Sequence, residues 1–244
     1  MLKMIRAGMY SSVQDGGREG QRQSGISLCG ALDKPSLVIA NLLVGNAGNA
    51  AALEITLGQV DIQFERDCWF ALTGAACEAM LDGEPVWVGW RMAAKAGQHL
   101  VLKTPQYGIR SYLAVAGGID VPEVLGSRCT DLKVGIGGLE GRRLQDGDRL
   151  KLGKASRRFS TSRGVKSLPI GNRIRALPGP EYHEFDRASQ GAFWRSPGSL
   201  APRATGWDIV CRANRLRAPP IAKCFRTACC RGWYRFRITV SRLS

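Results

Sequence analysis

Short apolar or alternating runs recur between glycine-based turns in residues 1–153, which is the pattern of a strand-rich domain. The predicted strands are Leu2–Ile5, Leu53–Thr56, Val60–Phe64, Cys68–Leu72, Val86–Val88, Leu100–Lys103 and Tyr112–Ala116. Asp82-Gly83 predicts a hairpin turn. Many short strands at close spacing favour a barrel or a sandwich over a parallel α/β sheet.

One early segment has helical rather than alternating spacing. Pro35 suits a first helical turn, and apolar residues recur at Leu37, Ala40 and Val44. Gly45 is a natural stop, so these positions predict a helix that ends near Gly45.

A second domain is predicted to begin after residue 169. Residues 154–169 are rich in Ser, Arg and Lys without periodicity and are expected to form a linker. Ile174–Leu177 then predicts a strand, and a second helix is indicated by apolar residues at helical spacing: Tyr182, Phe185, Ala188 and Ala192. We therefore expect domain boundaries at 1–153 and 170–197.

Composition changes sharply after residue 197. Residues 198–244 hold nine Arg and one Lys against Asp208 alone, a net charge of +9 out of +15 for the chain. Four of the eight Cys lie there. They form no C-x2-C pair and have no nearby His, which argues against a structural zinc site. The Arg residues show neither helical periodicity nor a known motif, which disfavours nucleic-acid binding.

The remaining 197 residues carry a net charge of +6 and no stretch that predicts a membrane span or a secretory signal. A reducing cytoplasmic setting is expected, with Cys29, Cys68, Cys77 and Cys129 as buried thiols. The sequence has no Walker loop, dinucleotide fingerprint or nucleophile elbow. With only two His, His99 and His183, a His-based triad or metal site is disfavoured.

Polar residues interleaved with Gly between Gln14 and Gly58 form the densest candidate for function. Loops of this kind present carboxylates and guanidinium groups to a small anionic or amide substrate. The alternative for each residue is structural, with Asp15 capping a turn and Arg18 pairing with it.

Several long motifs in order resemble one family. They are VQDGGREGQRQSGIS, GALDKPSLVIANLLVGN and ALEITLG near the start, ALTGAACEAMLDGEPV (71–86), SYLAVAGGIDVPEVLGSRCTDLKVGIGGLEGRRLQDGDRL (111–150) and RALPGPEYHEF (175–185). They resemble the biotin-dependent carboxyltransferase family, also called allophanate hydrolase subunit 2 or KipA-like. Cys129 departs from this pattern, where Ser is expected.

The resemblance implies a mainly β fold of cyclophilin-like barrel architecture, with the second barrel incomplete in this chain. It implies ATP-dependent opening of 5-oxo-L-proline to L-glutamate by a 5-oxoprolinase, together with a KipI-like partner and a LamB/YcsF-like partner. Because no phosphate loop is present, ATP handling is expected at least partly in a partner protein or at a shared interface. No metal site or biotin attachment is expected in this chain. The alternatives are a non-catalytic Kip-type regulator that binds a kinase inhibitor and a component of a urea or allophanate carboxyltransferase.

Seven polar residues of the matched motifs are the candidate site. Asp15, Asp33 and Asp131 are candidate catalytic carboxylates, acting as general bases. Candidate substrate-binding residues are Arg18, Asn41, Glu54 and Lys133. Sequence spacing does not show which of them converge in space.

The family match stops near residue 197, and codons suggest why. Gly198–Pro202 can be encoded so that one added base reads Trp-Gln-Leu-Ser-Pro instead. In the same frame, Arg226–Gly232 becomes Ser-His-Gly-Leu-Leu-Pro-Gly, similar to the expected family continuation. We therefore expect residues 198–244 to be an out-of-frame, disordered tail that leaves the family fold truncated and its activity impaired.

Resequencing the gene from its source tests this expectation. We expect a single missing base near the codon for Gly198. Related genes that encode Gly198–Ser244 in an intact frame would contradict it.

Overall fold

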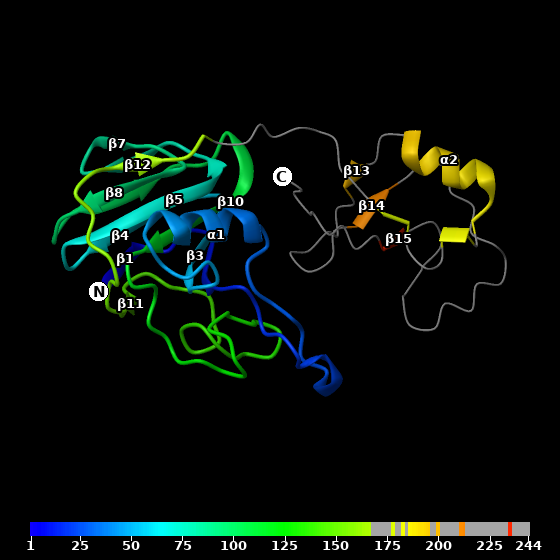
Figure 1. The fold of residues 1–244 in the computed structure, drawn as a ribbon, viewed down its shortest axis with the longest axis horizontal. Coiled ribbons are helices and arrows are strands. Elements are labelled where there is room, and N and C mark those ends of the chain that lie inside the picture. The colour runs from blue at the N-terminus through cyan, green and yellow to red at the C-terminus, as the bar shows by residue number, and fades with distance from the viewer. Residues whose placement is uncertain are drawn as a thin grey trace. The chain divides into compact units, whose positions relative to one another are not determined.

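The computed structural model describes residues 1–166, 177–178, 182–183, 185–195, 199–200, 210–212 and 234–235. The chain divides into two compact units, Met1–Leu168 and Pro169–Ser244, and each is described by itself. Figure 1 shows the first unit as layered strands with one helix against a sheet, α1.

Antiparallel strands build the first unit, which confirms the predicted mainly β class. One six-stranded sheet has the order β11-β1-β4-β9-β6-β7, and the other has the order β12-β8-β5-β10-β3-β2. Their bounds are β1 Leu2–Arg6, β2 Tyr10–Gln14, β3 Ala52–Thr56, β4 Val60–Phe64, β5 Cys68–Ala76, β6 Ala79–Leu81, β7 Glu84–Val86, β8 Trp90–Ala94, β9 His99–Leu102, β10 Tyr107–Val115, β11 Arg149–Leu150 and β12 Arg163–Gly164. A short 3-10 helix spans Arg22–Ser24, and α1 spans Lys34–Leu43.

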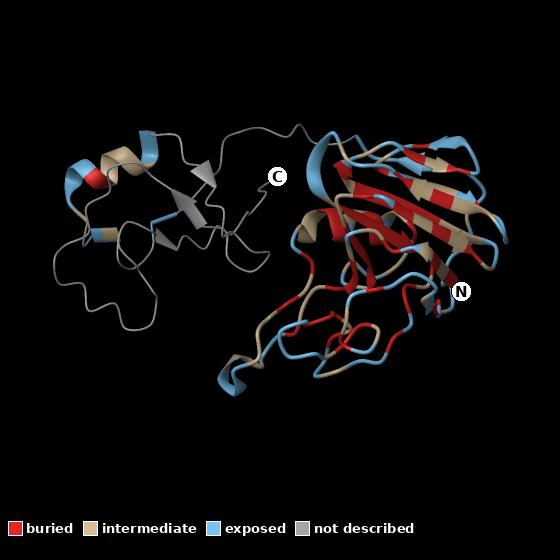
Figure 2. Cartoon of the chain, turned by 180° about the vertical axis from the view of Figure 1, so that it is seen from behind, coloured by how far each residue is buried: buried red, intermediate tan, exposed pale blue. Residues whose placement is uncertain are grey.

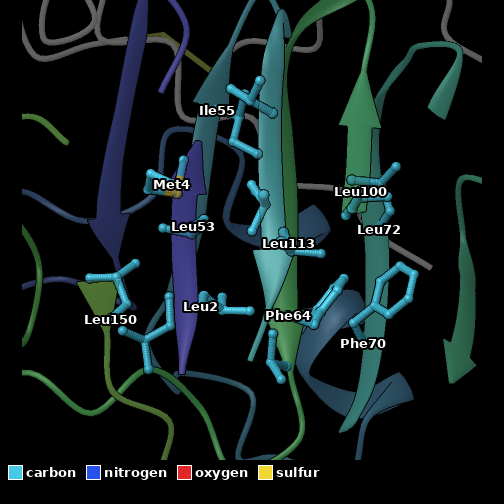
Figure 3. Close-up of a cluster of buried hydrophobic side chains, with 14 of the residues drawn as sticks. Leu2, Met4, Leu53, Ile55, Phe64, Phe70, Leu72, Leu100, Leu113 and Leu150 are labelled. Atoms are coloured by element: carbon cyan, nitrogen blue, oxygen red, sulfur yellow. The ribbon is translucent and has the colours of Figure 1, made fainter. Parts of the chain in front are cut away.

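The main hydrophobic core lies between the two sheets (Figure 3). In β4, Val60, Ile62 and Phe64 are fully buried, whereas the alternate residues Asp61 and Gln63 are half-buried. Each such burial contributes about 1.5–3 kcal/mol, so the alternation fixes which face of the strand points inward.

The hairpin predicted at Asp82-Gly83 joins β6 to β7. Both residues have positive φ, +49° and +88°, which is the backbone of a two-residue turn that follows the twist of the strands.

Helix α1 covers the outer face of the second sheet, as the spacing of its apolar residues predicts. Leu37, Ala40 and Val44 are buried there against residues of β3, β5 and β10. Asp33 is the N-cap, and its carboxylate accepts from the Ser36 amide at 3.2 Å. The exposed side of the helix carries Leu42.

The second unit contains α2 (Arg187–Arg195) and a three-stranded antiparallel sheet of β13 (Ser199–Leu200), β14 (Val210–Arg212) and β15 (Tyr234–Arg235). Helix α2 lies in the segment where a second helix is predicted. No helix among the described residues has the length and apolar character needed to span a membrane.

The domain boundaries remain predictions. Two residues of the expected linker 154–169 form β12, which pairs with β8. The predicted strand Ile174–Leu177 lies outside the described residues apart from Leu177, and so does most of 198–244.

A bidentate ion pair holds the loop that precedes β11 against β1. Arg142 donates from Nη1 and Nη2 to the Asp148 carboxylate at 2.8 and 3.0 Å, and the pKa of Asp148 is lowered by these bonds. The Asp148 carbonyl in turn accepts from the Met4 amide at 2.8 Å. This pair therefore helps to hold the loop against the start of the core.

Asp148→Asn is expected to lower the free energy of unfolding by about 1 kcal/mol at pH 7, since solvent screens this partly exposed pair. The pKa of the Asp148 carboxyl is lower in the folded protein than in the unfolded chain. Its ionised form therefore stabilises the fold at pH values above the unfolded-state pKa. The difference from wild type should therefore shrink as the pH falls below about 4. Urea unfolding at several pH values measures it. Glu140→Gln, which removes the more exposed partner of Arg142, is the control; an equal loss in both variants would contradict the assignment.

Candidate functional site

A polar row crosses the outer face of the second sheet. Strand register aligns Ser12 with Glu54, Glu54 with Tyr112, and Tyr112 with Thr73. Their sequence neighbours, including Leu53 and Leu113, belong to the core between the sheets. Because side chains alternate along a strand, the polar row points away from that core.

Glu54 is the acceptor at the centre of this row. Its Oε2 accepts from the Tyr112 hydroxyl at 2.7 Å and from the Leu32 amide at 2.9 Å. The same hydroxyl accepts from the Asp33 amide at 2.7 Å. Burial, and then the nearby Glu54 charge, raise the pKa of Tyr112, so this hydroxyl stays protonated and donates. The cap of α1 is thereby fixed to the sheet.

Arg110 lies in the next row, where register aligns Tyr10 with Thr56 and Thr56 with Arg110. Its Nη1 donates to the Thr56 hydroxyl and lies 3.8 Å from Glu54 Oε1. Its Nε is buried without a hydrogen-bond partner, although 18% of the side chain is exposed. A guanidinium held this way can bind a carboxylate from solvent.

We call Tyr10, Asp33, Glu54, Arg110 and Tyr112 the sheet-face cluster. Tyr10, Asp33 and Arg110 are half-buried, whereas Glu54 and Tyr112 are buried. The cluster therefore combines a partly exposed arginine with a buried carboxylate and hydroxyl that are bonded to each other. The arginine is the member that can bind a small acid.

A second cluster joins the loop after β2 to the loop that precedes β11. Asp15 Oδ1 accepts from the Gly17 amide and the Ser127 hydroxyl, and Oδ2 accepts from the Arg128 amide at 2.6 Å. Arg18, only 1% exposed, donates to the carbonyls of Val124 and Cys129 at 3.0 Å each. Arg18 thus holds main-chain carbonyls, and its Nη1 has no hydrogen-bond partner.

Asp131 belongs to the same loop junction, which we define as residues 14–30 packed on residues 121–137. It is fully buried. Its carboxylate accepts from the Ser27 hydroxyl at 2.9 Å and from the Lys133 amide at 3.0 Å. Figure 2 shows burial extending from the strands into the loops of this unit.

The loop junction contacts the polar row along β2. Gln14 Nε2 donates to the Ser12 hydroxyl at 3.0 Å and to the Thr130 carbonyl at 3.2 Å. Ser12 belongs to the polar row, and Thr130 belongs to the loop junction. The side chain of Gln14 therefore links the loop junction to Ser12 of the polar row.

The side chains of two predicted site residues belong to neither cluster, although the Lys133 amide donates to Asp131. Asn41 donates to the Ala50 carbonyl at 2.8 Å and accepts from Asn46, which ties the end of α1 to the following loop. The Lys133 side chain is exposed. The structure thus brings Asp33 and Glu54 together in one cluster and Asp15, Arg18 and Asp131 together in the other.

The sequence interpretation missed Arg110, Tyr112 and Tyr10. The available signal was period-2 spacing in β10, where Arg110, Tyr112 and Ala114 share one face. The prediction considered mainly the polar residues between positions 14 and 58. Arg110 and Tyr112, which contact Glu54 of that segment, lie on β10.

Comparisons with known proteins identify the family. The profile described as "Carboxyltransferase domain, subdomain A and B" matches residues 24–205. The C subunit of 5-oxoprolinase from Escherichia coli (strain K12) is 68% identical over 216 residues, which cover 88% of this chain and 67% of that protein. The corresponding C subunit from Haemophilus influenzae is 42% identical over 200 residues, which cover 82% and 64%.

Solved structures share the fold. The crystal structure of TTHA0988 is 32% identical and matches with a TM-score of 0.77, covering 89% of this chain and 79% of that chain. The urea amidolyase of K. lactis matches with a TM-score of 0.78 at 26% identity, covering 89% of this chain but 14% of that chain. The chain spans about two thirds of the length of the two curated 5-oxoprolinase relatives. It belongs to the carboxyltransferase domain family, subdomains A and B.

Proposed function

We propose that this chain is one component of an ATP-dependent 5-oxoprolinase, which hydrolyses 5-oxo-L-proline to L-glutamate. The observation that carries the proposal is the 68% identity to the E. coli 5-oxoprolinase protein. Opening an unstrained lactam in water is thermodynamically poor, so coupling to ATP is chemically reasonable. The partners are the KipI-like protein and the LamB/YcsF-like protein of the same enzyme.

The sheet-face cluster is the proposed substrate site. 5-Oxoproline carries a carboxylate and a lactam, and Arg110 supplies a guanidinium for the former. Glu54 lies 3.8 Å from Arg110 and accepts from the Tyr112 hydroxyl at 2.7 Å, so these two residues help to fix the guanidinium. Asp33 contributes through its amide, which donates to Tyr112. No ATP-binding role is assigned to a residue of this chain.

The loop junction is proposed to position this site. The carboxylates of Asp15 and Asp131 accept bonds from loop amides and hydroxyls that hold the fold. This argues against their use as general bases. Arg18 supports the same loops, and Lys133 and Asn41 lie outside the proposed site.

We also propose that an out-of-frame tail begins at Gly198; the family profile matches residues 24–205, which include the first eight residues of that tail. The reasons are the charge and composition of residues 198–244 and the codon relation. Activity assays should therefore use a version with the frame restored at Gly198, alongside the chain as it stands.

The alternative is carboxyl transfer in urea breakdown, which the match to the K. lactis urea amidolyase favours. A substrate panel separates the two functions. The frame-restored chain with its partners is offered 5-oxoproline with ATP, or urea with bicarbonate, ATP and a biotin-carrying protein. The proposal expects glutamate release from the first mixture alone; biotin-dependent consumption of urea would favour the alternative.

A further inference from the structure

Two buried cysteines meet across the loop junction. Cys29 is 9% exposed and Cys129 is fully buried, and both are free thiols. The Cys29 thiol donates to the carbonyl of Thr130, the residue after Cys129, at 3.0 Å. This contact places the Cys29 sulfur beside the main chain of the loop that carries Cys129. One cysteine therefore comes from each of the two loops.

The backbone holds this meeting point closely. Cys29 has φ of +52°, which is uncommon for a residue with a side chain. A Cβ on Gly17 would lie 2.9 Å from the Cys29 carbonyl oxygen, so the beginning and the end of loop 14–30 pack in close contact. On the opposite loop, the Cys129 amide donates to the Ser127 hydroxyl at 3.1 Å. These contacts hold the main chain in place at both cysteines.

The surroundings give the two thiols different roles. The neighbouring Cys29 side chain lowers the pKa of the Cys129 thiol to about 7, with help from Ser127 and from the Arg18 charge. The neighbouring Cys129 side chain and burial raise the pKa of Cys29. Cys129 is therefore the more acidic thiol of the two. Thiolates are the form that reacts with peroxides.

We propose that Cys29 and Cys129 form a reversible disulfide when the protein meets hydrogen peroxide. The Cys129 thiolate attacks one peroxide oxygen, the O–O bond breaks and hydroxide leaves, giving a sulfenic acid. The Cys29 sulfur then attacks the Cys129 sulfur, the S–O bond breaks and hydroxide leaves. The Cys29 proton and one proton from solvent convert the two hydroxides to water. Two thiols are oxidised and one peroxide is reduced.

The bond would act on the sheet-face cluster through a short segment. A disulfide draws the sulfur atoms to about 2.05 Å. Cys29 lies three residues before Leu32, whose amide donates to Glu54 at 2.9 Å. Oxidation therefore moves the segment that carries a partner of Glu54 and ties it covalently to the opposite loop.

Mass spectrometry of the full chain tests the proposal. The native protein is treated with a small excess of peroxide, quenched in denaturant with an alkylating reagent and digested. We expect one dominant disulfide-linked peptide pair containing Cys29 and Cys129, which dithiothreitol removes. Cys68 and Cys77, whose thiol pKa values are raised by burial, should remain alkylated.

Two comparisons make the result specific. In Cys129→Ser the linked pair should disappear, whereas Cys77→Ser should leave it unchanged. Oxidation in urea should distribute links among the eight cysteines of the chain. The proposal is overturned if native wild-type protein leaves both Cys29 and Cys129 alkylated under conditions that oxidise a free model thiol, or links them mainly to other cysteines.

Discussion

Asp15→Ala is expected to lower the free energy of unfolding of the first unit by about 3–5 kcal/mol. The Asp15 carboxylate is 8% exposed and accepts from two amides and one hydroxyl. Each donor left unpaired in a buried place costs about 1–3 kcal/mol. Urea unfolding, followed by the fluorescence of the half-buried Trp69, measures the loss.

Two further variants separate a structural from a catalytic Asp15. Asp15→Asn keeps the shape and one acceptor oxygen but turns an amino group toward a backbone donor, so its stability should fall between wild type and Asp15→Ala. Glu19→Ala, at an exposed position of the same loop, should change stability by less than about 0.5 kcal/mol. A fully stable Asp15→Asn protein without turnover would instead support a catalytic role.

Arg110→Met is expected to reduce kcat/KM for 5-oxoproline about 10- to 100-fold in the frame-restored complex. A charge-assisted hydrogen bond to a carboxylate contributes about 1.5–3 kcal/mol, which corresponds to this range. The effect should fall mainly on KM, because the guanidinium binds a substrate group that does not react. Steady-state kinetics over a range of 5-oxoproline concentrations measures both constants.

The controls for this variant use other arginines. Arg163→Met, at an exposed position of β12, should leave both constants unchanged. Arg110→Lys keeps the charge but loses the planar fork, so it should give an intermediate KM. If Arg110→Met is as stable as wild type and has an unchanged KM, Arg110 does not bind the substrate carboxylate.

Periodicity was sufficient for much of the fold. The alternation of Val60–Phe64 and the helical spacing from Leu37 to Val44 predicted β4 and α1 because burial imposes those patterns directly. It failed for β2, where Ser11 and Ser12 are buried polar residues. It also failed for β11 and β12, which are two residues long and too short to show a period.

The candidate site was predictable only in part. Glu54 and Asp33 were predicted because they lie in a Gly-interleaved polar segment, and the structure brings them into one cluster. Arg110 and Tyr112 were missed because their link to Glu54 depends on the register between β10 and β3. That register follows from the packing of whole sheets, which local spacing along the chain does not encode. The carboxylates of Asp15 and Asp131 likewise accept hydrogen bonds from residues more than 100 positions away in the sequence.

ATP-dependent glutamate release from 5-oxoproline by the reconstituted complex tests the central claim most directly. The frame-restored chain is combined with the KipI-like and LamB/YcsF-like partners, and each component or ATP is omitted in turn. The account predicts glutamate release only when all three proteins and ATP are present. Undiminished release without this chain, or no release from the complete mixture while every protein is folded, would contradict it.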